Sequence, residues 1–369
     1  MKILAVHQGY ELYGSDRMFI LSLTALKEKY PDALITANIP KDGKLADYLR
    51  DNNVCDHLVI KPMAVLRKSD IKRLRLNKLL GSLWRIRETI RFCNTYDIVY
   101  INSIVVLSYL LAARYTKGKV LLHIHEIPST KLMLFFRQLI RISKVSCLYI
   151  SQAVCSHFNL KNNGIIVING IKGFPFQKKE FTKPLNFLMI GRINDWKGQD
   201  FLIQSLTRLA LTNKSIDFRL RILGSVFENQ RHFLEKINGL IENSIIKEKV
   251  KIIDFVDDPW ENYRWADVVF VPSKRPEPFG LVAIEAMSAG AIVIGAEHGG
   301  LSEIFENNHS GLYFKPSDET DLIRAVLVLQ NNRESCFKIA KNGRKLFERE
   351  YTEQAYINRF VGALTKLNF

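Results

Sequence analysis

Residues 272–290 read Pro-Ser-Lys-Arg-Pro-Glu-Pro-Phe-Gly-Leu-Val-Ala-Ile-Glu-Ala-Met-Ser-Ala-Gly, and this stretch decides the fold. The apolar run at 267–271 before it predicts a β-strand, and the prolines that follow exclude a helix or a central strand in the next loop. A helix is predicted from near Phe279 to Gly290, a typical helix stop. A second apolar run at 291–295 completes the strand, loop, helix and strand of a βαβ unit in a parallel sheet.

Two carboxylates and a glycine make this unit a candidate ligand site. Glu277 lies in the loop before the predicted helix, and Glu285 lies about one turn inside it. Gly280, at the helix start, has no side chain to keep a ligand from the backbone, and the free N–H groups there form an anion site. Diphosphate on those groups and hydroxyls on a carboxylate would suit a sugar nucleotide. The alternative is that both glutamates are solvated charges favoured by the helix dipole.

Size and composition restrict the class of protein. A chain of 369 residues is long enough for two domains, and a hydrophobic content of 47% excludes general disorder. No apolar run is long enough to span a membrane, and Met1–His7 reads as a first strand rather than a signal peptide. The five cysteines are scattered without a C-x-x-C pair, which predicts reduced thiols and neither disulfides nor a zinc site. These features predict a cytoplasmic protein.

The charge predicts an anionic partner. The formal net charge is +16, and residues 61–91 contain ten basic side chains against two acidic ones, interleaved with apolar residues. A basic amphipathic helix of this kind suits an anionic membrane surface, although a solvated helix face is an equal alternative. Residues 129–144 predict a second basic amphipathic helix, in which Phe135, Phe136 and Leu139 are expected to be core residues unless they insert at a lipid surface.

Strand-like and helical runs alternate along both halves of the chain, which predicts two α/β domains. A segment rich in Gly, Pro and Lys at about 171–185 separates the halves and is interpreted as a linker. The predicted strands lie at 3–7, 33–38, 57–60, 97–101, 119–126, 148–151 and 165–168 in the first half, and at 187–190, 219–223, 250–255, 267–271, 291–295 and 311–314 in the second.

The residues around the two glutamates resemble the sequence motifs of a known family. Glu277 and Glu285, with seven residues between them, are similar to the E-x7-E motif of retaining glycosyltransferases of family 4, and residues 286–290 and 298–304 are also similar to that family. The resemblance implies a GT-B fold, in which two Rossmann-like doubly wound domains face a central cleft. It assigns residues 1–172 to an acceptor-binding domain, 173–185 to the linker, 186–350 to a nucleotide-sugar domain, and about 351–369 to a helix that packs back onto the first domain.

The same resemblance assigns roles in the second half. Arg192 and Lys197 lie five residues apart on one predicted strand-to-helix loop, a spacing with which two cations can clamp a diphosphate. The resemblance implies that they stabilise the diphosphate leaving group together with the helix start at Phe279, Gly280 and Leu281. It further implies that Glu285 binds the ribose and that Glu277 binds the donor sugar.

The first half contributes two further candidates by resemblance. His125 ends a predicted strand and, with Glu126, is similar to the His-Asp or His-Glu pair that contacts the transferred sugar. A lone strand histidine is more often structural, and His123 is interpreted in that way. Gly14, in the loop after the first strand, is the candidate nearest the donor diphosphate, with Arg17 a weaker one. No third ligand accompanies the two histidines, so no metal site is predicted.

The functional hypothesis is a retaining, metal-independent glycosyltransferase without a cofactor. It would transfer a sugar from a UDP or GDP sugar to a lipid-linked oligosaccharide, in assembly of O-antigen or capsule, as a monomer or dimer on the inner face of the cytoplasmic membrane. No nucleic acid is expected as a partner, because no recognised binding motif accompanies the basic charge. A basic nucleic-acid-binding protein and a GT-B nucleotide-sugar epimerase, which would need no acceptor, remain the alternatives.

Overall fold

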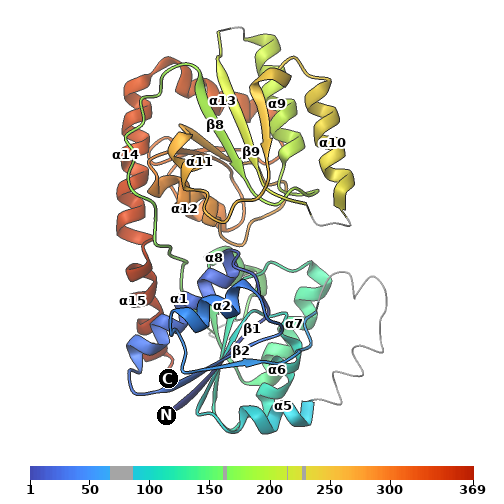
Figure 1. Ribbon diagram of the computed structural model, residues 1–369, viewed down its shortest axis with the longest axis vertical. Coiled ribbons are helices and arrows are strands. Elements are labelled where there is room, and N and C mark those ends of the chain that lie inside the picture. The colour runs from blue at the N-terminus through green and yellow to red at the C-terminus, as the bar shows by residue number, and fades with distance from the viewer. Residues whose placement is uncertain (67–85, 161–163, 214, 227–229) are drawn as a thin grey trace. The chain divides into compact units, whose positions relative to one another are not determined.

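The chain forms two compact units in a computed structural model (Figure 1). The first unit comprises Met1–Gly170 with Glu353–Phe369, and the second comprises Ile171–Thr352. The structure describes residues 1–66, 86–160, 164–213, 215–226 and 230–369, so most of the basic stretch at 61–91 lies outside the described residues.

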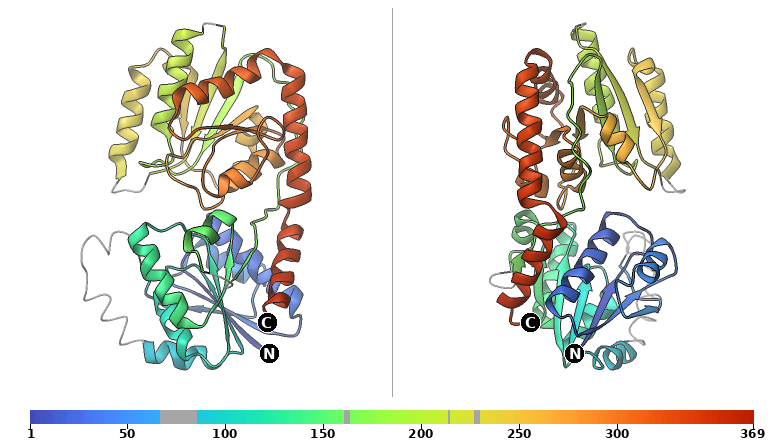
Figure 2. Two further views of the ribbon diagram at one scale, coloured as in Figure 1. Left: turned by 180° about the vertical axis from the view of Figure 1, so that it is seen from behind. Right: turned by 60° about the vertical axis from the view of Figure 1, so that its left-hand side comes forward.

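The first unit is built on a parallel sheet with the strand order β3-β2-β1-β4-β5-β6-β7. Helices cover both faces of this sheet (Figure 2). The strands are β1 (Lys2–His7), β2 (Leu34–Ile39), β3 (His57–Ile60), β4 (Ile98–Asn102), β5 (Lys119–Ile124), β6 (Ser146–Tyr149) and β7 (Gly164–Ile166). The helices are α1 (Gly14–Lys29), α2 (Lys44–Asp51), α5 (Ile86–Cys93), α6 (Leu107–Ala112), α7 (Thr130–Ser143), α8 (Gln152–Phe158) and α15 (Glu353–Lys366).

The strand order reverses between β1 and β4, and ligands of open α/β sheets bind at the carboxyl edge of such a switch point. The register there pairs His7 with Asn102 and Asn102 with His123. Most residues of these strands are buried, as in a parallel sheet covered on both faces. The register therefore gathers buried polar side chains at one edge of the sheet.

The second unit repeats the architecture with the strand order β10-β9-β8-β11-β12-β13. Its sheet is also parallel, and the order reverses between β8 and β11. The strands are β8 (Leu185–Ile190), β9 (Phe218–Leu223), β10 (Val250–Ile253), β11 (Val268–Val271), β12 (Ile292–Ala296) and β13 (Leu312–Phe314). The helices are α9 (Gln199–Thr212), α10 (Arg231–Glu242), α11 (Trp260–Trp265), α12 (Leu281–Ser288), α13 (Glu319–Asn331) and α14 (Arg333–Glu350).

The segment expected to be a linker is instead packed onto the second unit. Phe174 stacks on Trp260 with ring centroids 5.5 Å apart, and Phe181 is buried in the core. The Nζ atom of Lys179 donates to the carbonyl oxygens of Tyr263 and Arg264 at 2.9 and 2.7 Å, and burial lowers the pKa of this lysine to about 8. The change of unit falls at Gly170, and residues 173–185 are part of the second unit.

The C-terminal helix α15 belongs to the first unit and lies beside α1 (Figure 1). The hydroxyl of Tyr356 on α15 is 2.7 Å from the hydroxyl of Ser22 on α1, and Lys29 donates to Thr365 at 2.7 Å. Tyr356 and Phe360 are fully buried, so this helix completes the core of the first unit. No helix among the described residues is long and apolar enough to cross a membrane.

Candidate functional site

The loop between β8 and α9 presents Arg192 and Lys197 at the switch point of the second sheet. Gly198 at its end has a φ of +88°, and a Cβ there would lie 2.0 Å from the carbonyl oxygen of Pro272. Only glycine allows this approach without strain. The N–H of Lys274 donates to the carbonyl oxygen of Trp196 at 2.7 Å, which joins the loop to the one after β11. Two loops distant in sequence are thus held side by side.

Lys197 and Glu277 meet where these two loops touch. The Nζ atom of Lys197 is 2.6 Å from Oε1 of Glu277, and the side chains are 21% and 8% exposed. The hydroxyl of Ser273 donates to the same oxygen at 2.5 Å. The Lys197 ammonium also lies 4.4 Å from the centre of the Trp196 ring. A buried carboxylate needs such charged and hydrogen-bonding partners, so Glu277 is held in one orientation.

The His298-Gly299-Gly300 segment fixes the backbone of Glu277. Glu277 and Gly299 form a parallel bridge, and the N–H of Gly300 donates to the carbonyl oxygen of Glu277 at 2.7 Å. Gly299 has a φ of +61°, and a Cβ there would lie 2.4 Å from that oxygen. His298 Nε2 is 2.7 Å from the carbonyl oxygen of Ser273, which requires the ring proton on Nε2, and burial lowers the pKa of this histidine. The segment therefore acts as a support for Glu277.

Helix α12 begins four residues after Glu277, at Leu281. Gly280 is its N-cap, with a φ of +136°, and Phe279 beside it is buried. Leu281 is the first helical residue, and the first backbone hydrogen bond of the turn is donated by Ala283 to the carbonyl oxygen of Gly280 at 2.9 Å, so the N–H groups of Gly280, Leu281 and Val282 precede the helical bonds. In the second turn, Glu285 accepts a hydrogen bond from the hydroxyl of Tyr263 at 2.5 Å. The helix start and the two glutamates thus lie on one continuous stretch of backbone.

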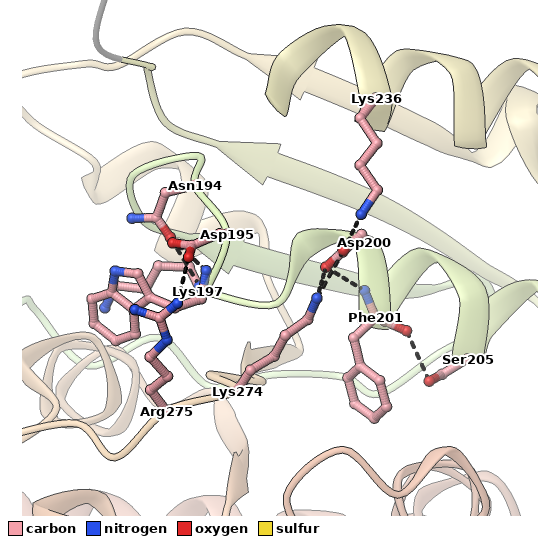
Figure 3. Close-up of polar contacts among 10 residues, drawn as sticks. Asn194, Asp195, Lys197, Asp200, Phe201, Ser205, Lys236, Lys274 and Arg275 are labelled. Atoms are coloured by element: carbon pink, nitrogen blue, oxygen red, sulfur yellow. Dashed lines mark hydrogen bonds and ion pairs between the residues drawn. The ribbon is translucent and has the colours of Figure 1, made fainter. Parts of the chain in front are cut away.

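Ion pairs around the β8–α9 loop hold it in place (Figure 3). Asp200, in the first turn of α9, is 2.8 Å from the Nζ atom of Lys236 and 2.7 Å from that of Lys274. Asn194 accepts from the backbone N–H of Lys197 at 3.0 Å, and Arg275 pairs with Asp195. The loop that carries Lys197 is therefore fixed from both sides before any ligand binds.

The predicted residues of the first unit form a separate group. His125 follows β5 and is partly exposed, and its Nε2 atom is 2.8 Å from Oδ1 of Asn102. Glu126 accepts from the backbone N–H of His125 at 3.1 Å and from the hydroxyl of Ser103. Burial raises the pKa of the Glu126 carboxyl. Glu126 thus stabilises the turn that contains His125. The other candidate of this unit, Gly14, is the first residue of α1 and is partly exposed.

The sequence predicted Lys197, Glu277, Gly280 and Glu285 in one site, and the structure places them on adjoining loops and α12. Arg192 is exposed on the same loop as Lys197, and its carbonyl oxygen accepts from Gln199 at 3.1 Å. His125 and Gly14 lie in the other unit. The described residues contain no cluster of three or more His, Cys, Asp or Glu side chains that could hold a metal ion.

Sequence reasoning missed several supporting residues. Ser273 holds Glu277, and its only sequence signal is its place two residues after a buried strand. Asn102 and His7 both end strands at the switch point, a position that could have identified them. Asp16 lies nine residues after His7 in sequence, and their contact at 2.7 Å had no sequence signal.

Comparisons with known proteins found relatives of the second unit. Residues 171–346, nearly all of the second unit, match the family model described as glycosyl transferases group 1. An uncharacterized glycosyltransferase of Methanocaldococcus jannaschii is 30% identical over 51% of this chain and 49% of its own length. A D-inositol 3-phosphate glycosyltransferase of Stackebrandtia nassauensis is 34% identical over 37% of this chain and 31% of its own length. The chain spans about half the length, or less, of these curated relatives.

Solved structures match the whole chain at low identity. HepE of Anabaena, in a crystal structure with UDP and glucose, superposes with a TM-score of 0.81 at 18% identity, over 99% of this chain and all of that one. Sucrose-phosphate synthase of Thermosynechococcus elongatus superposes with a TM-score of 0.76 at 16% identity over both whole chains. The predicted fold class is confirmed: the chain has two Rossmann-like α/β domains as in structures of the GT-B fold, and its residues 171–346 are similar to glycosyl transferases of group 1.

Proposed function

We propose that this protein is a glycosyltransferase that moves a sugar from a nucleotide sugar to an acceptor hydroxyl. The observation that carries the proposal is the Lys197–Glu277 pair, 2.6 Å apart and mostly buried, with Glu277 four residues before the start of α12. A cation, a row of helix-start N–H groups and a carboxylate are the groups needed for a diphosphate and a sugar hydroxyl. The family match of the second unit supports the same function.

The proposed mechanism assigns a part to each group. Lys197, Arg192 and the N–H groups at Gly280 and Leu281 stabilise the charge that grows on the diphosphate as the sugar leaves. Glu277 accepts hydrogen bonds from hydroxyls of the sugar. Glu285 does the same for the ribose. His125 contacts the transferred sugar.

The stereochemical outcome follows from the same proposal. The sugar is transferred with retention of its anomeric configuration, and no divalent metal is needed, because the two cations and the helix start supply the positive charge. An epimerase would act on the nucleotide sugar alone. Turnover that depends on an added acceptor hydroxyl therefore separates transfer from epimerisation.

Nucleotide binding tests the donor site directly. We expect UDP or GDP to raise the melting temperature, and EDTA to leave the shift unchanged. A ligand at 100 times its Kd adds about 2.7 kcal/mol to the free energy of unfolding, which thermal denaturation detects easily. ADP serves as the comparison nucleotide.

The variants and outcomes of this experiment are specific. Lys197→Met should lose the nucleotide-dependent shift, whereas Lys236→Met, which removes a 58% exposed lysine paired with Asp200, should keep it. A shift that disappears with EDTA would contradict the metal-independent mechanism. Salt-sensitive binding to nucleic acid, with no shift for any of the three nucleotides, would favour the alternative of a nucleic-acid-binding protein.

We also propose that the acceptor is a lipid-linked oligosaccharide on an anionic membrane surface, as in O-antigen or capsule assembly. The support is the outer face of α7, where Leu134, Phe135 and Ile142 are 52%, 47% and 59% exposed. Lys131 and Arg141 lie on the same exposed face, and α7 contains no acidic residue. Exposed apolar side chains flanked by basic ones suit the interface of an anionic bilayer.

Vesicle sedimentation tests this membrane contact. We expect Phe135→Ser with Ile142→Ser to reduce binding to anionic phospholipid vesicles about tenfold or more, because two large side chains no longer enter the bilayer. Leu211→Ser, at a 61% exposed leucine of α9, is the matched control and should bind as the unaltered protein does. Equal binding by all three proteins, or efficient glycosylation of a soluble acceptor alone, would contradict the proposal.

A further inference from the structure

A chain of polar side chains leads from the start of α1 to His125. Asp16 Oδ1 is 2.7 Å from Nε2 of His7, Nδ1 of His7 is 2.8 Å from Nδ2 of Asn102, and Oδ1 of Asn102 is 2.8 Å from Nε2 of His125. Asp16, His7 and Asn102 are at most 2% exposed. Water therefore does not compete for these hydrogen bonds, and each donor must face an acceptor.

Asp16 determines which atom donates and which accepts in the first hydrogen bonds of this series. A carboxylate only accepts, and Asp16 takes the N–H of Tyr13 on Oδ2 at 2.8 Å and the Nε2–H of His7 on Oδ1. With its proton on Nε2, the ring of His7 presents a lone pair at Nδ1. The amide N–H of Asn102 donates to that lone pair. The backbone carbonyl oxygen of Asn102 lies farther from Nδ1, at 3.3 Å, so the amide N–H at 2.8 Å is the nearer partner of this nitrogen.

The same order of donors and acceptors determines which nitrogen of His125 carries its proton. With its NH₂ group facing His7, Asn102 presents its oxygen to the hydroxyl of Tyr100 at 2.7 Å and to Nε2 of His125. The ring proton of His125 must then lie on Nε2, which leaves a lone pair on Nδ1. Nδ1 has no partner among the described residues and is not buried. Burial lowers the pKa of His125 to about 3, so its ring is neutral.

We propose that Asp16, acting through His7 and Asn102, fixes the tautomer of His125, so that His125 offers a hydrogen-bond acceptor at Nδ1 to a hydroxyl of the bound sugar. Asp16, His7 and Asn102 are thus positioning residues, and His125 is the group that touches substrate. The contact with the sugar rests on the proposed function, whereas the tautomer is a property of the ligand-free protein.

The absence of a side chain at Gly9 makes room for the contact between Asp16 and His7. A Cβ at Gly9 would lie 1.7 Å from Oδ1 of Asp16 and 2.7 Å from Nε2 of His7. Any side chain at this position would push the two groups apart. His7 is also stacked on Phe19 with ring centroids 4.7 Å apart, which fixes the plane of its ring. Gly9 and Phe19 therefore fix the positions of the Asp16 carboxylate and the His7 imidazole relative to each other.

The variant Asp16→Asn should reverse the whole chain of bonds. The N–H of Tyr13 requires the amide oxygen of the new side chain, so its NH₂ group would face Nε2 of His7. The proton of His7 would then move to Nδ1, and Asn102 would turn its oxygen toward His7 and its NH₂ group toward His125. The proton of His125 would consequently move from Nε2 to Nδ1, and the ring would change from acceptor to donor on its open side.

Nitrogen NMR of the ligand-free protein measures this tautomer. Long-range correlation spectra of histidine-labelled protein report which ring nitrogen carries the proton, and His125→Gln identifies the signals of His125. We expect the Nε2–H form in the unaltered protein and the Nδ1–H form in Asp16→Asn. Asp97→Asn is the matched control, since Asp97 also accepts a backbone N–H, from Lys2 at 2.7 Å. This control should keep the Nε2–H form.

The outcomes separate this proposal from the proposed function. An Nδ1–H form of His125 in the unaltered protein would overturn the proposal even if Asp16→Asn fails to fold, and so would an unchanged tautomer in a folded Asp16→Asn. Where the tautomer reverses, we expect kcat/KM for sugar transfer to fall about tenfold, with a Kd for the nucleotide alone within about twofold. A reversed tautomer in a protein that transfers no sugar would leave the tautomer assignment standing and contradict only the proposed function.

Discussion

Lys197→Met is expected to lower kcat by about 10²–10³-fold, because the variant loses a preorganised cation at the leaving diphosphate. Methionine is apolar and of similar length, so it fills the space of the lysine chain, but it loses the contact of the ammonium with the Trp196 ring, 4.4 Å from its centre. It leaves Glu277 buried with the hydroxyl of Ser273 as its remaining side-chain partner, at a cost of about 1–3 kcal/mol in the free energy of unfolding. Steady-state kinetics with the nucleotide sugar identified by the thermal shift, together with thermal denaturation, measure both effects.

The control separates charge loss at the site from charge loss in general. Lys236→Met removes one positive charge from the other side of the same loop, where the lysine pairs with Asp200 and is 58% exposed. Asp200 keeps its ion pair with Lys274, 2.7 Å away, so the loop stays in place and this variant should retain its kcat within about twofold. A folded Lys197→Met that also retains its kcat would show that the cation does not act on the leaving group.

Glu277→Gln is expected to reduce kcat/KM by about 10–100-fold with a smaller effect on folding. Glutamine has nearly the same shape, and its oxygen can still accept from Lys197 and Ser273. The loss of charge weakens both bonds, however, and an NH₂ group replaces the second oxygen that would accept from a sugar hydroxyl. Kinetics measured with the donor and the acceptor varied separately should show the loss in kcat/KM for the donor sugar.

Two further variants make this test sharper. Glu297→Gln changes an exposed glutamate that follows β12 and should leave the kinetics unchanged. The double variant Lys197→Met with Glu277→Gln should lose less activity than the product of the two single losses, because residues in direct contact act as a unit. A fully multiplicative loss would mean that the two residues contribute independently, in contrast to the 2.6 Å contact.

The sequence predicted the unit around Glu277 closely. The predicted strands at 267–271 and 291–295 and the helix from Phe279 to Gly290 correspond to β11, β12 and α12 within two residues at each end. Pro272 and Gly290 explain this success, because proline and glycine limit the backbone locally, whatever packs around them. The buried apolar runs between these residues could then be only elements of a parallel sheet.

Other expectations failed where packing decides. Gly173, Pro175 and Pro184 indicated a linker, but Phe174 and Phe181 attach that segment to the second unit. Phe135 was expected in the core with Phe136 and Leu139. It is instead 47% exposed, whereas those two are buried, because the orientation of α7 on its sheet decides which of two adjacent phenylalanines faces inward. The orientation of α7 cannot be predicted from composition and spacing alone.

The sequence by itself determined two parallel α/β domains and identified Arg192, Lys197, Glu277 and Glu285 as candidates, because those signals lie within single loops and helices. Only the tertiary structure brought Lys197, 80 residues away in sequence, to Glu277, and Asn102 between His7 and His125. The physical reason is that strand order and register place the ends of β1, β4 and β5, or of β8 and β11, side by side. A local pattern fixes where a strand ends, but not which other strand ends beside it.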